Sequence, residues 1–312
     1  MSRLLRLLVL ASLGLAFVVV VVGAYVRLSD AGLGCPDWPL CYGQPLPGDL
    51  ADRDALAKAW KEMGHRYLAG TLGLLILILS LCSWKTRQSP RLATALLALV
   101  IFQATLGAWT VTMLLKPAIV TAHLLGGMTV LALLAWMALA QFFGSSAPEA
   151  RKLRGAAVIA LAALGVQIAL GGWVSSNYAA LACPDLPLCL GQAVPPMDFR
   201  NAFHVLRELG ETPQGELLSR EALTAIHWSH RMFALVAVAV IGWAAYRALA
   251  VSRALAALIA LLVILQFSLG VANVLVSRPL GLAAAHNAGA ALLLIALVVL
   301  NFFAFRGSDP SK

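Results

Sequence analysis

Four of the six histidines in the chain stand in two matched pairs, and imidazole is the side chain best suited to bind a metal ion or move a proton near neutral pH. His65 and His230 are each followed directly by an arginine. His123 and His286 each follow a proline, by six and seven residues respectively. The repetition predicts two sites of similar chemistry, each with two imidazoles.

Two imidazoles without a nearby set of cysteine or carboxylate ligands suit a haem iron better than zinc, which takes four ligands in its structural sites. A lone histidine in an apolar helix is equally well explained as a contact between helices, but four at matched positions favour two bis-histidine haem sites. Arg66 and Arg231 follow the first histidine of each pair and could bind haem propionates. Anchoring at the membrane surface explains these arginines equally well.

One ionisable residue breaks the symmetry between the pairs. Glu62 precedes His65 by three residues, whereas His227 occupies the same place before His230. Residues three apart share a helix face, so Glu62 would lie beside a haem edge, where it could act as a base or stabilise positive charge. The alternative is a solvated carboxylate at a helix start, where negative charge is favourable.

The elements that carry these residues are predicted to be membrane helices. Hydrophobic residues make up 61% of the 312, charged residues only 12%, and the mean hydropathy is +0.86, too apolar for a soluble domain. A span needs about 20 apolar residues, and its backbone groups must be paired internally, so each long run predicts a helix. We expect eight such helices, near 7–27, 65–84, 92–113, 118–142, 153–176, 225–248, 253–275 and 280–304. The first is too long for a signal peptide and has no cleavage site, so it is expected to be retained.

Basic residues predict the orientation of these helices. Short segments on one side carry 12 of the 23 Lys and Arg residues, with only Glu149 and Asp309 as acids. These segments are 1–6, 85–91, 143–155, 246–253 and 306–312. Positive charge favours the cytoplasmic side, so both termini are expected there. The charge is explained by topology, and no nucleic-acid partner is predicted.

Two cysteine pairs lie in the long loops on the outer side. The phrases are "CPDWPLC", from Cys35 to Cys41, and "CPDLPLC", from Cys183 to Cys189. An oxidising compartment such as the bacterial periplasm permits a disulfide in each loop. Cys82 stands alone near the cytoplasmic end of its helix and is expected to be a small buried hydrophobe.

The cysteine phrases belong to a longer internal repeat. Residues 23–44 align without gaps to 171–192, with 12 of 22 positions identical, and matches around all four histidines follow in the same order. We therefore expect an all-α integral membrane protein whose eight transmembrane helices form two pseudo-symmetric four-helix bundles by tandem duplication. The N-terminal half would span 1–143, a cytoplasmic linker 144–155, and the C-terminal half 156–312.

A finer repeat marks the odd-numbered spans. "QATLGAW" (103–109), "QIALGGW" (167–173) and "QFSLGVA" (266–272) share Gln-x3-Gly, whereas "VVVVGAY" (19–25) in the first span has the glycine without the glutamine. Small residues in membrane helices allow close approach of a neighbour, which is a helix or a flat cofactor.

The motifs "EMGHR", "HWSHR", "TAHLLGG" and "AAAHNAG", together with the cysteine pairs, resemble those of the haem A synthase family, which acts in cytochrome oxidase biogenesis. The resemblance covers essentially all eight expected helices. It implies that one half holds the substrate haem O and the other a haem b. It also implies that the C8 methyl of haem O is oxidised to a formyl group through hydroxylated intermediates, giving haem A.

The resemblance also implies roles for individual residues. His65 and His123 match the ligands of the substrate haem in the N-terminal, catalytic half, and Glu62 matches the catalytic carboxylate. His230 and His286 match the ligands of the haem b iron. Family members vary in their cysteines, and the presence of both pairs here favours a disulfide in each loop.

The remaining expectations concern place and partners. The resemblance implies a multi-pass protein of the bacterial inner membrane with haem sites near the periplasmic face and lipid around it. Haem O synthase is the expected donor of the substrate, and cytochrome oxidase assembly the destination of the product. Whether the chain forms a homo-oligomer, and what accepts its electrons, are left open.

Three other functions compete with this interpretation. A dihaem b-type electron-transfer protein, such as a quinone oxidoreductase, would need haems near both faces, whereas all four histidines lie towards one. A disulfide-generating oxidase would need a reactive pair closer than Cys-x5-Cys. A transporter would place its polar site at the midplane rather than at the outer edge.

Overall fold

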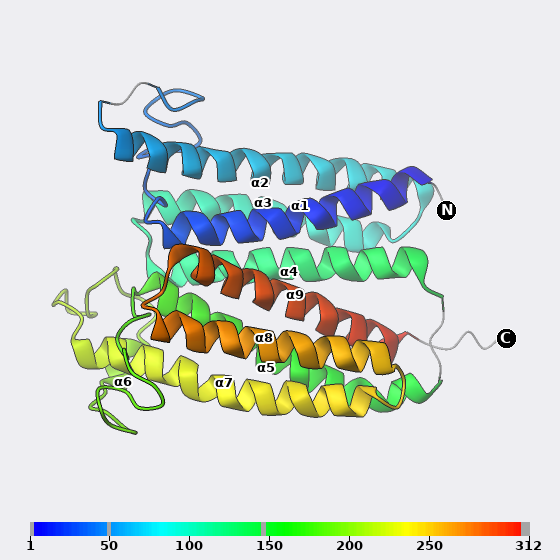
Figure 1. Cartoon of the computed structure of the whole chain (residues 1–312). Coiled ribbons are helices and arrows are strands. Elements are labelled where there is room, and N and C mark those ends of the chain that lie inside the picture. Colours follow the sequence, from blue (N-terminus) through cyan, green and yellow to red (C-terminus); the bar gives the residue numbers. More distant parts are fainter. Residues whose placement is uncertain (1–2, 49–50, 145–147, 307–312) are drawn as a thin grey trace.

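The computed structural model describes residues 3–48, 51–144 and 148–306 (Figure 1). Within these ranges the chain forms nine α-helices and one 3₁₀ helix, with no strand beyond isolated bridges. The helices are α1 (Arg3–Leu28), α2 (Arg53–Thr86), α3 (Pro90–Thr112), α4 (Pro117–Phe142), η1 (Pro148–Leu153), α5 (Arg154–Ser176), α6 (Phe199–Ala202), α7 (Arg220–Ala248), α8 (Arg253–Leu275) and α9 (Leu280–Phe305). The expected all-α fold is confirmed.

Eight helices of the described ranges are long and apolar enough to cross a membrane, which confirms a multi-pass membrane protein. Two of them begin earlier than their apolar runs. α2 starts at Arg53, where the Asp52 side chain accepts a hydrogen bond of 2.9 Å from the Asp54 N–H, and α7 starts at Arg220 after the cap Ser219. Hydropathy finds only the lipid-facing part of such helices, because their outer turns carry polar residues.

The eight spans pack as two closed rings of four (Figure 1). In the first ring α1 packs on α2, α2 on α3, α3 on α4 and α4 on α1. In the second ring α5 packs on α7, α7 on α8, α8 on α9 and α9 on α5. The rings meet where α9 packs on α1 and α4, and where α4 packs on α5. The arrangement is that of two bundles side by side, while their origin by duplication stays an interpretation.

α9 lies at the centre of the molecule. Of its most apolar 18-residue window, 67% is buried, compared with 17% for α3 and for α8. Near its C-terminal end Phe302 is fully buried and meets Trp136 of α4 edge to face, with ring centroids 5.2 Å apart. Asn301 donates a hydrogen bond of 2.9 Å to the Ala157 carbonyl of α5. α9 therefore joins both rings.

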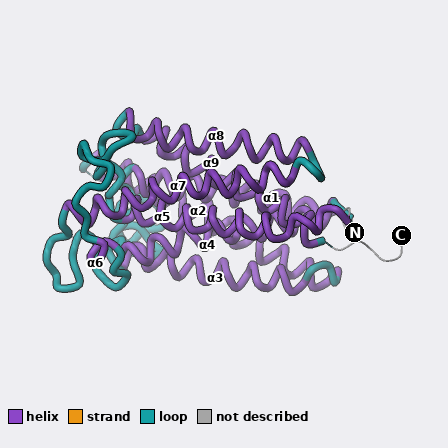
Figure 2. The backbone as a smooth tube through the Cα atoms, turned by 90° about the horizontal axis from the view of Figure 1, so that it is seen from below, coloured by secondary structure: helices purple, strands orange, loops and turns teal. Residues whose placement is uncertain are grey.

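The long loops gather at one end of the helices and the short connections at the other (Figure 2). Both disulfide loops and α6 lie at the loop-rich end, and α1 begins and α9 ends at the opposite end (Figure 1). Part of the expected linker 144–155 lies outside the described residues, since 145–147 are not described. Its remainder forms η1, and α5 begins within it at Arg154.

Candidate functional site

The four repeated histidines lie on four different helices: His65 on α2, His123 on α4, His230 on α7 and His286 on α9. Within each ring the two histidines lie on helices that face each other across the ring, α2 and α4 in the first and α7 and α9 in the second. All four side chains are half-buried. Each ring therefore carries the two histidines that the repeat assigns to one pair, and their joint binding of an iron stays a prediction.

Each imidazole lies against a glycine of the membrane helix that precedes its own, which is α1, α3, α5 or α8. A Cβ atom added at Gly23 would lie 2.8 Å from Cε1 of His65, and one at Gly107 would lie 3.3 Å from Cε1 of His123. In the second ring, Gly171 and Gly270 face His230 and His286 in the same way, at 3.1 Å and 3.2 Å. A side chain at Gly23 would displace the His65 ring, and one at the other three glycines would require a shift of the facing ring, so the glycines permit the close approach of each imidazole.

The donor set of each pair fits a haem iron. The Nδ1 atoms of His65, His123 and His286 are buried without a hydrogen-bond partner, so these rings have coordination capacity that the protein itself does not use. Among the described residues, no three histidine, cysteine or carboxylate side chains cluster as a metal site. Two imidazoles without a third protein ligand match bis-histidine haem and do not match tetrahedral zinc.

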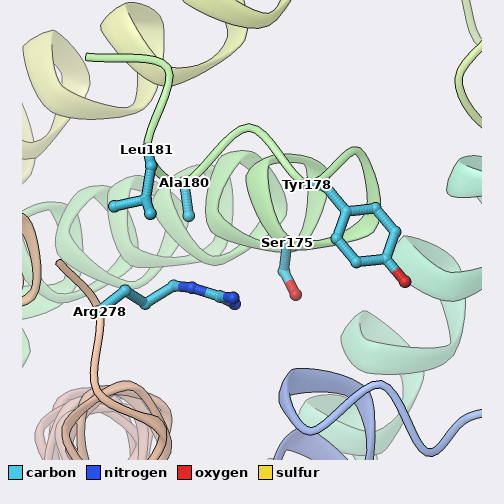
Figure 3. Close-up of a pocket in the computed structure, with 5 residues that line it drawn as sticks. All are labelled: Ser175, Tyr178, Ala180, Leu181 and Arg278. Atoms are coloured by element: carbon cyan, nitrogen blue, oxygen red, sulfur yellow. The ribbon is translucent and has the colours of Figure 1, made fainter. Parts of the chain in front are cut away.

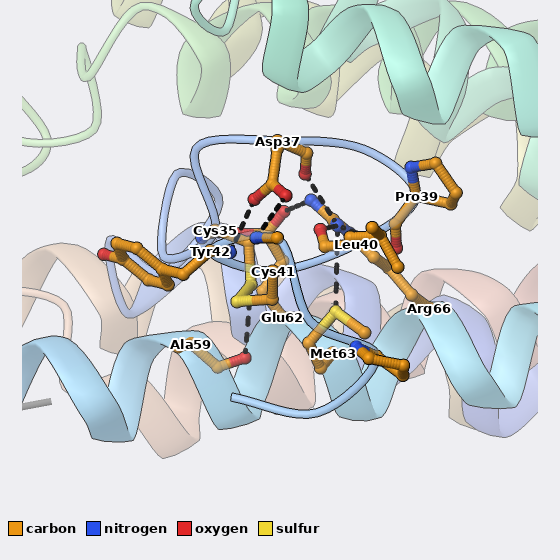
Figure 4. Close-up of a disulfide and its surroundings, with 12 residues drawn as sticks. Cys35, Asp37, Pro39, Leu40, Cys41, Tyr42, Ala59, Glu62, Met63 and Arg66 are labelled. Carbon is orange, nitrogen blue, oxygen red and sulfur yellow. Dashed lines mark hydrogen bonds and ion pairs between the residues drawn. A yellow bond between two sulfur atoms is a disulfide. The ribbon is translucent and has the colours of Figure 1, made fainter. Parts of the chain in front are cut away.

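Glu62 lies one turn before His65 on α2, with only 4% of its surface exposed (Figure 4). Its Oε2 accepts a hydrogen bond of 2.8 Å from the backbone N–H of Cys35, and its Oε1 forms an ion pair with Arg66. The alternative of a solvated carboxylate at a helix start is wrong, because α2 begins at Arg53 and the outer loop covers Glu62.

His227 holds the equivalent place in the second ring. Its Nδ1 accepts a hydrogen bond of 3.1 Å from the backbone N–H of Cys183, and its side chain is 4% exposed. Glu62 and His227 therefore make the same contact with the first cysteine of their respective loops. The sequence placed both three residues before a histidine, but it carried no signal that each supports a disulfide loop.

Arg66 and Arg231 donate to backbone carbonyls of the disulfide loops, and Figure 4 shows Arg66 against the first loop. Arg66 donates to the carbonyls of Asp37 at 2.9 Å and Leu40 at 2.8 Å. Arg231 donates to Pro187 at 3.2 Å and Leu188 at 3.0 Å. The two arginines thus fasten each loop to the helix that carries the first histidine of its pair.

Both disulfides form, Cys35 with Cys41 and Cys183 with Cys189, and Cys82 is free and half-buried. Inside the first loop, the Asp37 carboxylate accepts hydrogen bonds from the N–H groups of Tyr42 at 2.7 Å and Gly43 at 2.8 Å. The bond from Gly43, followed by that from Tyr42, lowers the pKa of Asp37 below its ordinary value. Asp185 repeats the arrangement with Gly191 and Leu190, and its pKa is lowered in the same way.

The longer second outer loop ties the two rings together. Arg207, which is 2% exposed, donates a hydrogen bond of 2.6 Å to Oδ1 of Asn177, just after α5. The next residue, Glu208, forms an ion pair of 2.6 Å with Lys116, which directly precedes α4 in the first ring. The sequence showed the extra length of this loop but gave it no role.

A small pocket of about 80 Å³ lies at the loop-rich end, between the end of α5 and the start of α9 (Figure 3). The side chain of Arg278 extends along it towards Ser175, and Tyr178 lies beyond (Figure 3). The pocket is too small for a porphyrin, and none of the repeated histidines lines it. It is therefore separate from the histidine pairs.

Comparison with known proteins places these features in a family. Residues 6–298 match COX15-CtaA, described as cytochrome oxidase assembly protein. The chain is 43% identical to a haem A synthase of Shewanella oneidensis, with 94% of each chain aligned. It is 31% identical to a haem A synthase of Caulobacter vibrioides, over 95% of this chain and 94% of the relative. A haem A synthase of Halalkalibacterium halodurans is 28% identical over 89% of each chain.

Proposed function

Because the chain belongs to the COX15-CtaA family of cytochrome oxidase assembly proteins, we propose that it is a haem A synthase. It is an oxidoreductase that converts the C8 methyl of haem O to a formyl group through hydroxylated intermediates. Relatives named haem A synthase that align over about nine-tenths of the chain or more support this function. No feature of the structure favours a dihaem electron-transfer protein over it.

The N-terminal half, 1–143, takes the substrate. His65 and His123 are the residues that would hold the iron of haem O. Their glycine neighbours Gly23 and Gly107 and their unpartnered Nδ1 atoms support this role. The closed ring of α1 to α4 surrounds the pair with apolar side chains, which suits a porphyrin with a hydrophobic tail.

The C-terminal half, 156–312, holds the resident haem b through His230 and His286. Haem b supplies one-electron transfer when bound. Arg231 lies one residue after His230, and its Nη1 is buried without a hydrogen-bond partner, so it keeps a donor for a propionate. Arg66 is proposed for the same role in the N-terminal half, beside its contacts to the loop.

One observation carries the catalytic assignment. Glu62 is a buried carboxylate on the same helix face as His65. The second half has an imidazole, that of His227, at the equivalent place. Each carboxylate oxygen has a second lone pair, so Glu62 can accept a proton while Cys35 and Arg66 keep it in place. Its proposed task is to accept a proton, or to stabilise positive charge, as the C8 methyl and then the alcohol are oxidised.

The proposed setting is the bacterial inner membrane, with both termini cytoplasmic and the histidines towards the periplasm. The short segments that are rich in Lys and Arg support this orientation, as do the two disulfides at the opposite end. Haem O synthase is the proposed donor of substrate, and cytochrome oxidase assembly receives the product.

Haem extraction from the purified full-length protein tests the function. The expected content is haem b together with haem O or haem A. Incubation of the protein with haem O in air, with a redox system that can carry electrons, should then yield haem A, because oxidation of a methyl to a formyl group needs an external oxidant. A preparation that holds haem b at both sites and never converts haem O would favour the dihaem electron-transfer protein instead.

A further inference from the structure

Three half-buried glutamines lie on the membrane helices, each four residues before a glycine that faces one of the histidines. They are Gln103 on α3, Gln167 on α5 and Gln266 on α8. Residues four apart share a helix face, so the amide and the glycine meet the same imidazole. An amide in a membrane span is costly unless it has a partner, so its place beside a histidine requires an explanation.

The closest contact is in the second ring. Gln167 Nε2 lies 3.2 Å from Nδ1 and 3.4 Å from Nε2 of His230, and it donates a hydrogen bond of 3.2 Å to the His230 backbone carbonyl. Its Oε1 is buried without a partner. The amide that lies beside the ring therefore also carries an unused acceptor, and a histidine that binds a metal through one ring nitrogen has a proton on the other to donate.

Gln266 makes a similar contact with His286, and Gln103 holds the matching place in the sequence, four residues before the glycine that faces His123. Gln266 Nε2 lies 3.4 Å from Nε2 of His286, and its Oε1 is buried without a partner. The two amides lie over Gly289 and Gly126, where any Cβ would overlap them.

His65 is the exception. Val19 stands in the first span where Gln167 stands in the third, four residues before Gly23. The His65 Nδ1 is buried and unpartnered, as it is in His123 and His286, so the difference lies in the residue at the glutamine position. Of the four repeated imidazoles, His65 alone has an aliphatic side chain in the place of the amide.

We propose that Gln103, Gln167 and Gln266 are positioning residues for the haem-binding imidazoles, and that Val19 makes His65 the exchangeable ligand of the substrate haem. This inference rests on the proposed function. A histidine that binds iron through one ring nitrogen is fixed in tautomer and plane by an acceptor for the N–H of the other. An amide that presents its Oε1 is such an acceptor.

The difference between His65 and the other three follows the task of each half. Haem b stays bound, so both of its ligands need support, and both have a glutamine. Haem O must enter the site and haem A must leave it, so one histidine has to dissociate from that iron. Supporting His123 and leaving His65 unsupported gives the substrate one fixed and one releasable imidazole.

The first test uses full-length protein that holds haem b, without turnover. Gln167→Leu and Gln266→Leu should speed transfer of haem b to apomyoglobin, because loss of such a partner typically weakens a metal site roughly 10–100-fold. They should also raise the haem midpoint potential, whereas Gln167→Glu and Gln266→Glu, which keep an acceptor, should retain haem and lower the potential. Gln141→Leu is the matched control, since Gln141 is a buried glutamine near the far end of α4.

The outcomes separate the two proposals. Wild-type protein without bis-imidazole haem b overturns the haem assignment and this inference together. Haem b that is present, but unchanged in retention and potential by the leucine variants, overturns this inference alone. Leucine and glutamate variants that shift the potential in the same direction would show a packing role only and overturn it as well.

The second test addresses His65. Protein loaded with haem O without oxygen should release it to apomyoglobin more slowly in Val19→Gln, by about tenfold at the low end of the range for such partners, and at the wild-type rate in Val19→Leu. Gln103→Leu should release haem O faster than wild type. Equal release from Val19→Gln and Val19→Leu would overturn the assignment of His65 as the exchangeable ligand.

Discussion

Glu62 Oε2 accepts a hydrogen bond of 2.8 Å from the backbone N–H of Cys35, so the carboxylate beside His65 also holds the first residue of a disulfide loop. In the second half His227 makes the same bond to Cys183 at 3.1 Å. Both halves therefore need an acceptor at this position, and an acceptor alone does not require charge. The first half has a carboxylate there, and because the hydrogen bond to Cys35 does not need its charge, we assign the charge a chemical role.

Replacing Glu62 by glutamine tests that role. Gln keeps an acceptor for Cys35 but cannot take a proton, and general acid–base groups typically contribute about 10²–10⁴ in rate, so haem A formation should fall by that order. Haem b at His230 and His286 should remain, and Glu62→Asp should keep partial activity. Haem analysis of cells that express each variant is the measurement. Near-normal haem A from Glu62→Gln would limit Glu62 to support of the loop.

The histidine pairs should be separable by haem content. His230→Ala and His286→Ala should lower haem b, because each removes an axial ligand of that site. His65→Ala and His123→Ala should leave haem b largely in place and abolish conversion of haem O. Pyridine haemochrome spectra of purified variants give the answer. Loss of haem b from His65→Ala, with retention in His230→Ala, would reverse the assignment of the halves.

Thiol counting checks the loops in the isolated protein. Under denaturing, non-reducing conditions only Cys82 should react, because the other four cysteines are paired. Cys82→Ser should abolish the signal and serves as the control. Five reactive thiols would contradict both disulfides and, with them, the outer location of the loops.

The Asp37 turn should depend on pH in a defined direction. Because hydrogen bonds from Gly43 and Tyr42 lower the pKa of Asp37 in the folded loop, its stabilising effect is complete above the ordinary carboxyl pKa. It is lost as the pH falls through the lowered value. Amide exchange at Tyr42 and Gly43 should accelerate, relative to neighbouring amides, only in strongly acidic buffer. Asp37→Asn should show that faster exchange already at neutral pH, whereas Asp30→Asn, outside the turn, should not.

The two contacts of the long second loop should differ in strength. Arg207→Met leaves the Oδ1 of Asn177 without its donor in a buried site, a loss of about 1–3 kcal/mol. Glu208→Gln removes an exposed ion pair with Lys116, worth about 0.2–1 kcal/mol and screened by salt. Limited proteolysis should therefore cut the loop faster in Arg207→Met than in Glu208→Gln. Equal rates would contradict the ranking.

The sequence predicted the eight spans well, because each is a long apolar run, while the pairing of the histidines stays a prediction from the repeat. It missed the outer turns of α2, where polar residues hide a helix that Asp52 caps. It also missed the contacts of Glu62, His227 and Arg207, since each joins residues far apart in the chain. Such contacts depend on how a loop folds back on a helix, and no local pattern encodes that.

α9 is made after the other spans, yet it lies at the centre of the packed helices. In the described part of the chain α9 follows the other seven spans, yet it packs on α1, α4, α5 and α8. The first ring must therefore wait in the bilayer with the faces of α1 and α4 still covered by lipid or by the insertion machinery. Release of the finished protein from that machinery depends on a helix that the ribosome makes last among the spans, so a nascent chain halted before α9 exposes the surfaces that membrane quality control recognises.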